Sequence, residues 1–251
     1  MLQVSNNITT AFIFAAGFGK RMLPLTNHTP KPLLSVNGKP ILEHIIARLD
    51  EEGIKRIIVN SHHLADQIEA FIDSRRALYP SIEFVTIFEP EILETAGGLV
   101  NAIEQGVLAD DKPFFTVNGD VLWANDYASP FGSLQQLWNN KDPDTTICMA
   151  VVSKANSKGY NGDGDFNLIN NMLVKEVNAK VYPYVFMGIQ VIDPIIFQNE
   201  AVRPYSLSQV YRDRVNASDG IVKNIQAIEY AGQWLHIGEP DMVDVADDPS
   251  D

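Results

Sequence analysis

The chain has 251 residues, of which 45% are hydrophobic and 20% are charged, as in ordinary globular proteins. Its formal net charge of −13 argues against a surface that binds nucleic acid or anionic membranes, although a local basic pocket can still bind a nucleotide. No apolar run approaches the roughly 20 residues that span a bilayer, and the single cysteine, Cys148, rules out an intramolecular disulfide and suits a reducing cytoplasm.

Strand-like and helix-like segments alternate through the first 152 residues. Short apolar runs predict five buried strands, at residues 11–16, 56–60, 81–88, 113–120 and 145–152. Amphipathic segments between them predict four helices, at residues 40–53, 64–74, 95–106 and 131–140. Thr95 is the expected N-cap of the third helix. This alternation is typical of an α/β protein whose parallel sheet is covered on both faces.

The second half of the chain has a different pattern. From about residue 153, turns and short apolar runs predict antiparallel strands within residues 158–168 and 171–192, a helix at 206–216, and strands at 220–230 and 232–238. We interpret this half as a lobe laid against the first half and not as an independent domain. The acidic stretch at residues 241–251 is expected to fray into solvent.

The first predicted strand runs into the loop AAGFGKRM, residues 15–22, where glycines and cations together indicate a phosphate-binding site. Gly17 and Gly19 fit the first two glycines of the dinucleotide fingerprint G-x-G-x-x-G, but Met22 occupies the third position. No G-K-[ST] follows, so the loop does not match a P-loop either. It continues past Pro24 to Lys31 as an extended, proline-stiffened path, whose backbone amides and cations can wrap a triphosphate.

Four motifs of the chain together resemble the sugar-phosphate nucleotidylyltransferase family. They are AAGFGKRMLPLTNHTPKPLL at residues 15–34, ETAGGLVNAI at 94–103, VNGDV at 117–121 and WLHIGEP at 234–240, in the family's order. The resemblance implies an α/β, Rossmann-like nucleotidyltransferase fold, with a doubly wound, mostly parallel central sheet and an antiparallel sugar-binding lobe. It also implies a single domain over residues 1–251, with a nucleotide-binding half at 11–152 and a sugar-binding half at 153–251.

The resemblance further implies a Mg²⁺-dependent reaction between a nucleoside triphosphate and a sugar 1-phosphate, which releases pyrophosphate and forms a nucleotide sugar. The short length, LETAGG and VNGDVLW look most like the branch that joins UTP to N-acetylmuramate 1-phosphate in peptidoglycan recycling. The branch that joins GTP to mannose 1-phosphate shares much of the pattern and stays as the alternative. The expected enzyme is cytoplasmic, is a monomer or homodimer, and has no nucleic-acid or membrane partner.

Residue roles follow from matching the family's motifs to this sequence. Arg21 can bridge phosphate oxygens with its guanidinium fork, and Lys31, held between two prolines, is expected to present its charge near the α-phosphate. Both are predicted to be catalytic. The expected nucleotide-binding residues are Ala15, Ala16, Gly17, Gly19, Glu89, Gly97 and Gly98, and the expected sugar-binding residues are Asn118 and Gly188. Purely steric roles stay open for Gly97 and Gly98 at a helix start and for Gly188 in a strand.

Asp120 and His236 are the predicted metal residues. Asp120 ends the fourth predicted strand, where open α/β sheets form their sites, and it matches the family's Mg²⁺ ligand. The family's second motif usually reads W-x-D-V-G, but here His236 takes the aspartate position in WLHIG. Because Mg²⁺ prefers oxygen ligands, an imidazole is a poorer ligand there than a carboxylate.

Two other functional classes remain as alternatives. A non-catalytic nucleotide-sugar sensor is compatible with His236, but the retention of both predicted catalytic cations and of Asp120 argues against it. A dinucleotide-dependent oxidoreductase conflicts with Met22, and also with Asn60, which ends the second strand where an acidic residue is expected.

Overall fold

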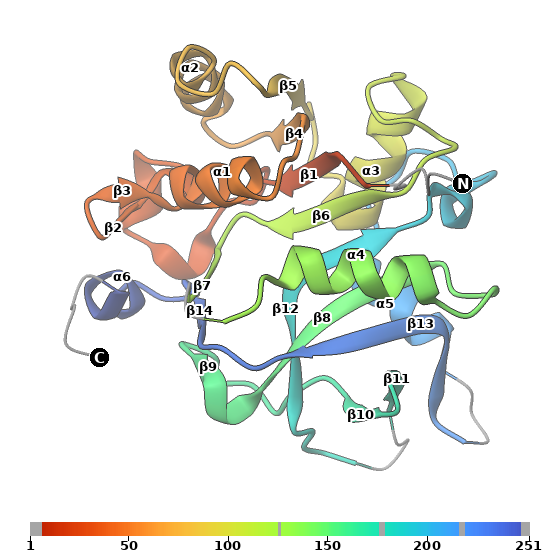
Figure 1. Cartoon of the computed structure of the whole chain (residues 1–251). Helices are drawn as coiled ribbons and strands as arrows, with labels where there is room; N and C mark the ends of the chain where they lie inside the picture. The colour runs from red at the N-terminus through yellow and green to blue at the C-terminus, as the bar shows by residue number, and fades with distance from the viewer. Residues whose placement is uncertain (1–6, 125–126, 176–178, 216–218, 247–251) are drawn as a thin grey trace.

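A nine-stranded sheet runs through the computed structural model, which describes residues 7–124, 127–175, 179–215 and 219–246. Its strands, in spatial order, are β10 (Asn167–Ile169), β11 (Met172–Val174), β13 (Ile221–Tyr230), β8 (Ile147–Ser153), β12 (Tyr184–Ile192), β6 (Phe114–Asn118), β1 (Thr10–Phe14), β4 (Arg56–Ser61) and β5 (Glu83–Phe88). The pairings make seven of them run in one direction, whereas β12 and β11 run in the opposite one. In Figure 1, β4 and β5 lie near the top of the view and β10 and β11 near its lower end. The predicted α/β fold with a mostly parallel central sheet is confirmed.

Helices cover both faces of this sheet, because its strands are apolar on both sides. In β1, Ala11 and Ile13 belong to one hydrophobic core and Phe12 to the other, as the two-residue period of a strand requires. The first core also contains apolar residues of α1 (Ile41–Glu51), α2 (Ala65–Arg75) and α4 (Pro130–Asn140). The second contains those of α3 (Glu94–Glu104) and α5 (Leu207–Asp213).

The strand order changes direction beside β1, and this switch positions the site. β1 pairs in parallel with β4 on one side and with β6 on the other. Ligands of open α/β sheets bind beyond the carboxyl ends of strands at such a switch point. The carboxyl end of β1 leads into residues 15–22, and that of β6 leads into residues 118–120.

Smaller elements complete the fold. A second sheet contains β7 (Val121–Trp123), β14 (Trp234–His236) and β9 (Ser157–Lys158), and a hairpin joins β2 (Ser35–Val36) to β3 (Lys39–Pro40). The short 3₁₀ helices are η1 (Lys20–Met22), η2 (Leu25–Asn27), η3 (Lys31–Leu33), η4 (Lys154–Asn156) and η5 (Pro194–Phe197). Because β14 pairs with β7, His236 lies opposite Val121 and so beside Asp120, more than a hundred residues earlier in the chain.

Two expectations from the sequence are wrong in detail. The acidic stretch does not fray over its first six residues, which form α6 (Asp241–Ala246), whereas residues 247–251 lie outside the described part of the chain. Thr95 does not cap its own helix, because α3 already begins at Glu94 and has no side-chain cap. In the described part of the chain, no helix is long and apolar enough to cross a membrane.

Candidate active site

A cavity of about 430 Å³ opens at the carboxyl ends of β1 and β6. Most of the predicted nucleotide and catalytic residues line it, together with two predicted for the sugar and the metal: Ala15, Ala16, Gly17, Gly19, Arg21, Lys31, Glu89, Asn118 and Asp120. The sequence places them in four separate segments, and the switch point of the sheet brings these segments together around one cavity. The cavity also has lining residues that sequence reasoning did not select, among them Asn60, Glu94, Thr95 and Ser206.

The glycine loop keeps its backbone accessible to a ligand. A Cβ built on Gly17 would meet nothing within 4 Å, so the chain there is open on the cavity side. Gly19 has a φ of 60°, and a Cβ on it would lie 2.8 Å from Thr26 Cγ2 and 3.2 Å from Lys31 Cβ. Only glycine suits that left-handed, crowded position. Its carbonyl accepts hydrogen bonds from the Thr26 hydroxyl and from the Met22 amide, which fixes the turn that carries Arg21.

Lys31 and Asp120, which both line the cavity, form an ion pair. Lys31 Nζ lies 2.6 Å from Asp120 Oδ2, and the two side chains are only 11% and 24% exposed. His236 Nε2 lies 3.6 Å from the same oxygen. Burial raises the pKa of Asp120, but the His236 imidazole and the Lys31 ammonium outweigh it and hold that pKa well below its usual range. Asp120 is therefore a carboxylate at neutral pH.

This arrangement fits a Mg²⁺ ion only as a site completed by substrate. Asp120 offers one partly exposed, ionised carboxylate, and Mg²⁺ commonly takes one or two carboxylates with substrate phosphates and water. Within the described residues, no three acidic, histidine or cysteine side chains gather into a metal site. His236 is close enough to share the region, but its imidazole nitrogen is a poor Mg²⁺ ligand.

Glu89 is a fully buried carboxylate that ties the cavity wall together. Its Oε1 accepts from Asn60 Nδ2 at 2.7 Å and its Oε2 accepts from the Leu93 amide at 3.2 Å. Asn60 Oδ1 in turn accepts from the Ala15 amide at 2.7 Å, at the start of the glycine loop. Burial raises the pKa of Glu89 above its usual value, and the two hydrogen bonds only partly offset this rise. Since both oxygens already have donors, Glu89 sits on the wall as a support for the loop.

Gly97 and Gly98 lie inside α3, and each leaves room for a neighbour. A Cβ on Gly97 would lie 2.2 Å from the Arg203 carbonyl oxygen, and one on Gly98 would lie 2.7 Å from Glu89 Oε1. Neither residue is among those that line this cavity. Steric crowding therefore explains why both positions are occupied by glycine. Contact of these glycines with a nucleotide stays a prediction.

A second cavity of about 220 Å³ adjoins the first, and Asn118 lines both. Apart from Asn118 and Val121, the residues that line it come from the second half of the chain and include Tyr160, Asp165, Lys175, Ser208, Tyr211, Arg212, Trp234 and His236. Gly188 does not line it, but supports Asn118 from behind. Gly188 has a φ of 83° at an irregularity in β12, and a Cβ on it would lie 2.9 Å from Asn118 Cβ.

Two cations in the second cavity were not anticipated from the sequence. Lys175 follows β11 and Arg212 lies on α5, where its Nη1 donates to Ser208 Oγ at 2.8 Å. Neither forms an ion pair within the part of the chain that the structure describes. The cavity's own carboxylate, Asp165, accepts from the Phe186 amide, and Lys175 partly offsets the burial that raises its pKa. No sequence motif marks these cations, because a turn and a helix bring them together from 37 residues apart.

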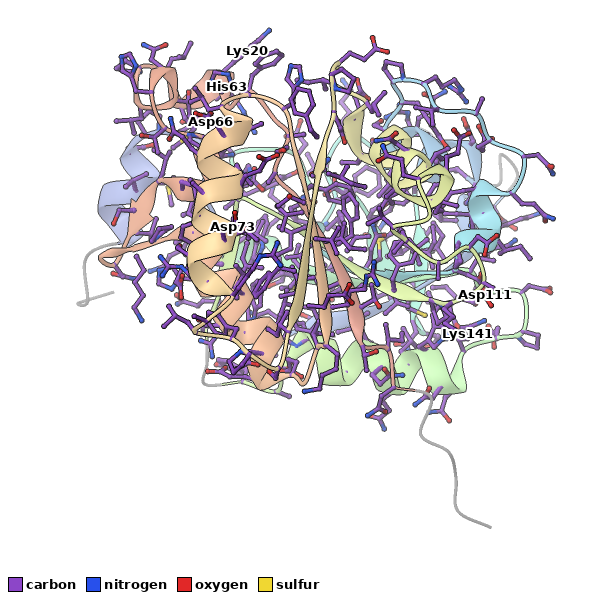
Figure 2. The ribbon with its side chains drawn as sticks, turned by 90° about the horizontal axis from the view of Figure 1, so that it is seen from above. Lys20, His63, Asp66, Asp73, Asp111 and Lys141 are labelled. Atoms are coloured by element: carbon purple, nitrogen blue, oxygen red, sulfur yellow. The ribbon has the colours of Figure 1, made fainter. Side chains whose placement is uncertain are left out.

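The tip of the glycine loop packs on two histidines. The Phe18 ring lies 5.3 Å from the His62 ring and 5.7 Å from the His63 ring, and Lys20 Nζ lies 5.3 Å from the Phe18 centroid. His63 Nε2 is 3.0 Å from the Thr26 carbonyl oxygen, so this histidine also braces the loop. Figure 2 shows Lys20 and His63 at the same edge of the molecule, beside Asp66 at the start of α2.

A family model and the sequences of known proteins indicate one family, and a solved structure shows the same fold. The sequence matches the nucleotidyl transferase family over residues 10–241. N-acetylmuramate alpha-1-phosphate uridylyltransferase of Caulobacter vibrioides is 31% identical over 233 residues, which cover 92% of each chain. Mannose-1-phosphate guanylyltransferase catalytic subunit beta of Drosophila pseudoobscura is 31% identical over 238 residues, which cover 93% of this chain and 60% of the relative. The crystal structure of HddC from Yersinia pseudotuberculosis with GMP-PN superposes with a TM-score of 0.68 at 21% identity, over 96% of this chain and 98% of that one, and so shares the fold.

Proposed function

This chain belongs to the nucleotidyl transferase family, and from that premise we propose that it transfers a uridylyl group from UTP to N-acetylmuramate 1-phosphate. The general activity, nucleotidyl transfer to a sugar 1-phosphate, is common to its relatives. The choice of UTP and of this sugar is the finer proposal. The relative that bears both in its name is 31% identical and matches the chain over 92% of either length.

The proposed reaction needs positioning more than covalent chemistry. A phosphate oxygen of the sugar 1-phosphate attacks the α-phosphorus of UTP, the bond from that phosphorus to the bridging oxygen breaks, and pyrophosphate leaves with the electron pair. Both substrates are anions that repel each other, so the site has to hold them in line and offset the charge that develops. Lys31 and Arg21, on the floor and loop of the first cavity, supply that positive charge.

Asp120 would hold the magnesium ion at the junction of the cavities, and the ion would neutralise phosphate charge there. Asp120 is already ionised and poised next to Lys31, so no proton has to leave before it can act. The glycine loop then orients the triphosphate with its backbone amides, and the Asn60–Glu89 pair keeps the start of that loop in place.

The single observation that carries the choice of sugar is the pair of cations in the second cavity. N-acetylmuramate differs from N-acetylglucosamine by a lactyl ether whose carboxylate is negative at neutral pH. Lys175 and Arg212 exceed the charge of Asp165 in that cavity, so a sugar with an extra carboxylate is electrostatically favoured over a neutral one. Mannose offers no group for these cations beyond its phosphate.

A pyrophosphate-release assay with four nucleoside triphosphates and three sugar 1-phosphates tests the proposal. We expect UTP with N-acetylmuramate 1-phosphate to give the highest kcat/KM, and N-acetylglucosamine 1-phosphate serves as the matched sugar that lacks only the lactyl group. Lys175→Met and Arg212→Met should each reduce the preference between these two sugars by about tenfold, the equivalent of one charged contact of about 1.4 kcal/mol. Higher activity with GTP and mannose 1-phosphate would move the chain to the guanylyl branch. Tight binding of both substrates without any turnover would favour the sensor.

A further inference from the structure

Residues of α3 and α5 physically join the two cavities. Ser206 lines the first cavity, while Ser208, Tyr211 and Arg212, only a few residues later, line the second. The start of α5 therefore stands between the two spaces. What holds this start in place also determines how the second cavity is shaped.

Thr95, which lines the first cavity, helps to fix the start of α5. Its Oγ1 accepts from the amide of Leu207, the first residue of α5, at 2.8 Å, across 112 residues of sequence. The first amides of a helix have no partner within the helix, so an outside acceptor fixes where the helix begins. Ser206 Oγ accepts from the Gln209 amide at 3.3 Å, which leaves the Leu207 amide to Thr95.

Backbone contacts make this junction continuous. The amides of Ala96 and Gly97 both donate to the Tyr205 carbonyl at 3.1 Å, and the Tyr205 amide donates to the Leu93 carbonyl at 3.1 Å. Gly97 permits this approach, because any Cβ there would collide with the Arg203 carbonyl. Backbone hydrogen bonds thus hold the first turn of α3 against the segment that leads into α5.

The first turn of α3, which lines the first cavity, contains a residue in an unfavourable backbone conformation. Glu94 has a φ of 58°, a left-handed conformation that is uncommon for a residue other than glycine, and it lines the first cavity next to Thr95. A ligand that contacts this wall of the first cavity therefore acts on the hydrogen bonds between α3 and the start of α5. A shift of the start of α5 would also shift the side chains that α5 presents to the second cavity, including Arg212, which is oriented by Ser208 on the same helix.

We propose that Thr95 is a positioning residue that couples the two cavities, so that a nucleotide in the first raises the affinity of the second for a sugar 1-phosphate. This inference rests on the proposed function and adds to it a route of communication. Such couplings are reciprocal, and factors of roughly 5 to 150 are typical. The hydrogen bond to Leu207 is the contact on which the coupling depends.

Calorimetric titration of the full chain measures the coupling without turnover. The probes are N-acetylmuramate 1-phosphate and a UTP analogue with a methylene group between its α- and β-phosphorus atoms. We expect the analogue to tighten binding of the sugar phosphate at least fivefold in the wild-type protein. Thr95→Val, which keeps the shape and removes the acceptor, should bring this factor close to one; the factor is a ratio of sugar-phosphate affinities and does not depend on the affinity for the analogue alone. Thr95→Ser should retain the wild-type factor.

A cap in another helix provides the matched control. Ser129 Oγ accepts from the Phe131 amide at the start of α4, and Ser129 lines neither cavity. Ser129→Ala should lower the thermal midpoint about as much as Thr95→Val does and leave the coupling factor intact. In steady-state assays, Thr95→Val should raise the KM for the sugar phosphate by a larger factor than it lowers kcat.

The possible results separate the inference from the function beneath it. A wild-type protein that binds both probes independently, or a Thr95→Val variant that keeps the wild-type coupling factor, overturns the inference and leaves the proposed function standing. A wild-type protein that binds neither probe overturns the proposed function, and the inference falls with it.

Discussion

Replacing Lys31 by alanine tests the cation at the junction of the two cavities. Its ammonium lies 2.6 Å from Asp120 Oδ2 and its side chain is 11% exposed, so its charge acts in a partly desolvated place. At an effective dielectric constant of about 20, a unit charge 4 Å away contributes about 4 kcal/mol. Only interactions that strengthen as charge develops on the transferred phosphate raise the rate. We therefore expect Lys31→Ala to lose about 3 kcal/mol of transition-state stabilisation, a fall of about 10²-fold in kcat.

The assay is pyrophosphate release at saturating UTP and N-acetylmuramate 1-phosphate. Lys31→Arg should rescue poorly, because a planar guanidinium fork does not replace the compact ammonium that lies 2.6 Å from Asp120 Oδ2 in a mostly buried position. Lys39→Ala, on the exposed hairpin strand β3, is the control and should keep full activity. A kcat for Lys31→Ala within a factor of three of wild type would refute the reasoning.

The same variant has a separate signature in stability. The pKa of Asp120 lies below its usual value of 3.8, since Lys31 and His236 outweigh the effect of burial. A carboxyl group whose pKa is lowered by folding stabilises the folded state above that usual value, and this contribution is lost as the pH falls through the folded-state pKa. Lys31→Ala should therefore lower the urea midpoint at pH 7 and flatten its decline below about pH 4. An unchanged pH profile would show that Lys31 does not control the carboxylate.

Substitutions at three further positions, Glu89, Gly98 and His236, test neighbouring contacts, and Gly132 provides a control. Glu89→Ala should cost about 2–4 kcal/mol in urea unfolding, because it leaves Asn60 and a backbone amide without an acceptor, whereas Glu89→Gln should cost about 1 kcal/mol and keep the order of preference among nucleotides. A changed preference in Glu89→Gln would instead place Glu89 on the base. Gly98→Ala should destabilise the fold by about 1–3 kcal/mol through overpacking against Glu89, while Gly132→Ala in α4, where a Cβ meets nothing within 4 Å, should stabilise it by about 0.5–1 kcal/mol. His236→Asp should lower the Mg²⁺ concentration that gives half-maximal activity, and Mn²⁺ should support the wild type at least as well as Mg²⁺; equal metal dependence in wild type, His236→Asp and His236→Ala would remove His236 from the metal region.

The central fold was predictable because its signals are local. The strands at 11–16 and 145–152 are short apolar runs, and the structure buries them on both faces as β1 and β8. Helix periodicity placed α1 within 40–53 for the same reason, since its buried residues recur at helical spacing. The cap at Thr95 failed because the hydroxyl of a threonine before an apolar run is expected to accept from an amide of its own helix, whereas here the amide that donates to it belongs to α5.

Contacts between distant segments account for what the sequence did not reveal. Asn60 carried no motif, yet it connects the Ala15 amide to Glu89 and so links a predicted base-contact residue to the glycine loop. The contact of Glu89 with the base stays a prediction. Lys175 and Arg212 come from an irregular stretch and a short helix, whose approach to one cavity depends on the antiparallel pairing of the second half. No spacing rule along the chain encodes such a meeting.

His236 combines both cases, because its position was predictable while its surroundings were not. The motif WLHIG placed it by resemblance, and the pairing of β14 with β7 brings it to Asp120. Its ring stacks on Trp234 with an angle of 1° between planes, and Trp234 is itself fixed by a hydrogen bond from its indole to the Met187 carbonyl. A Cβ on Gly238 would lie 2.8 Å from the imidazole, so the chain leaves room for a ring at this point. The backbone pairing thus holds residue 236 beside Asp120 whatever its side chain, and stacking on Trp234 orients the imidazole. The departure from the family pattern changes the donor atom there while its location is kept.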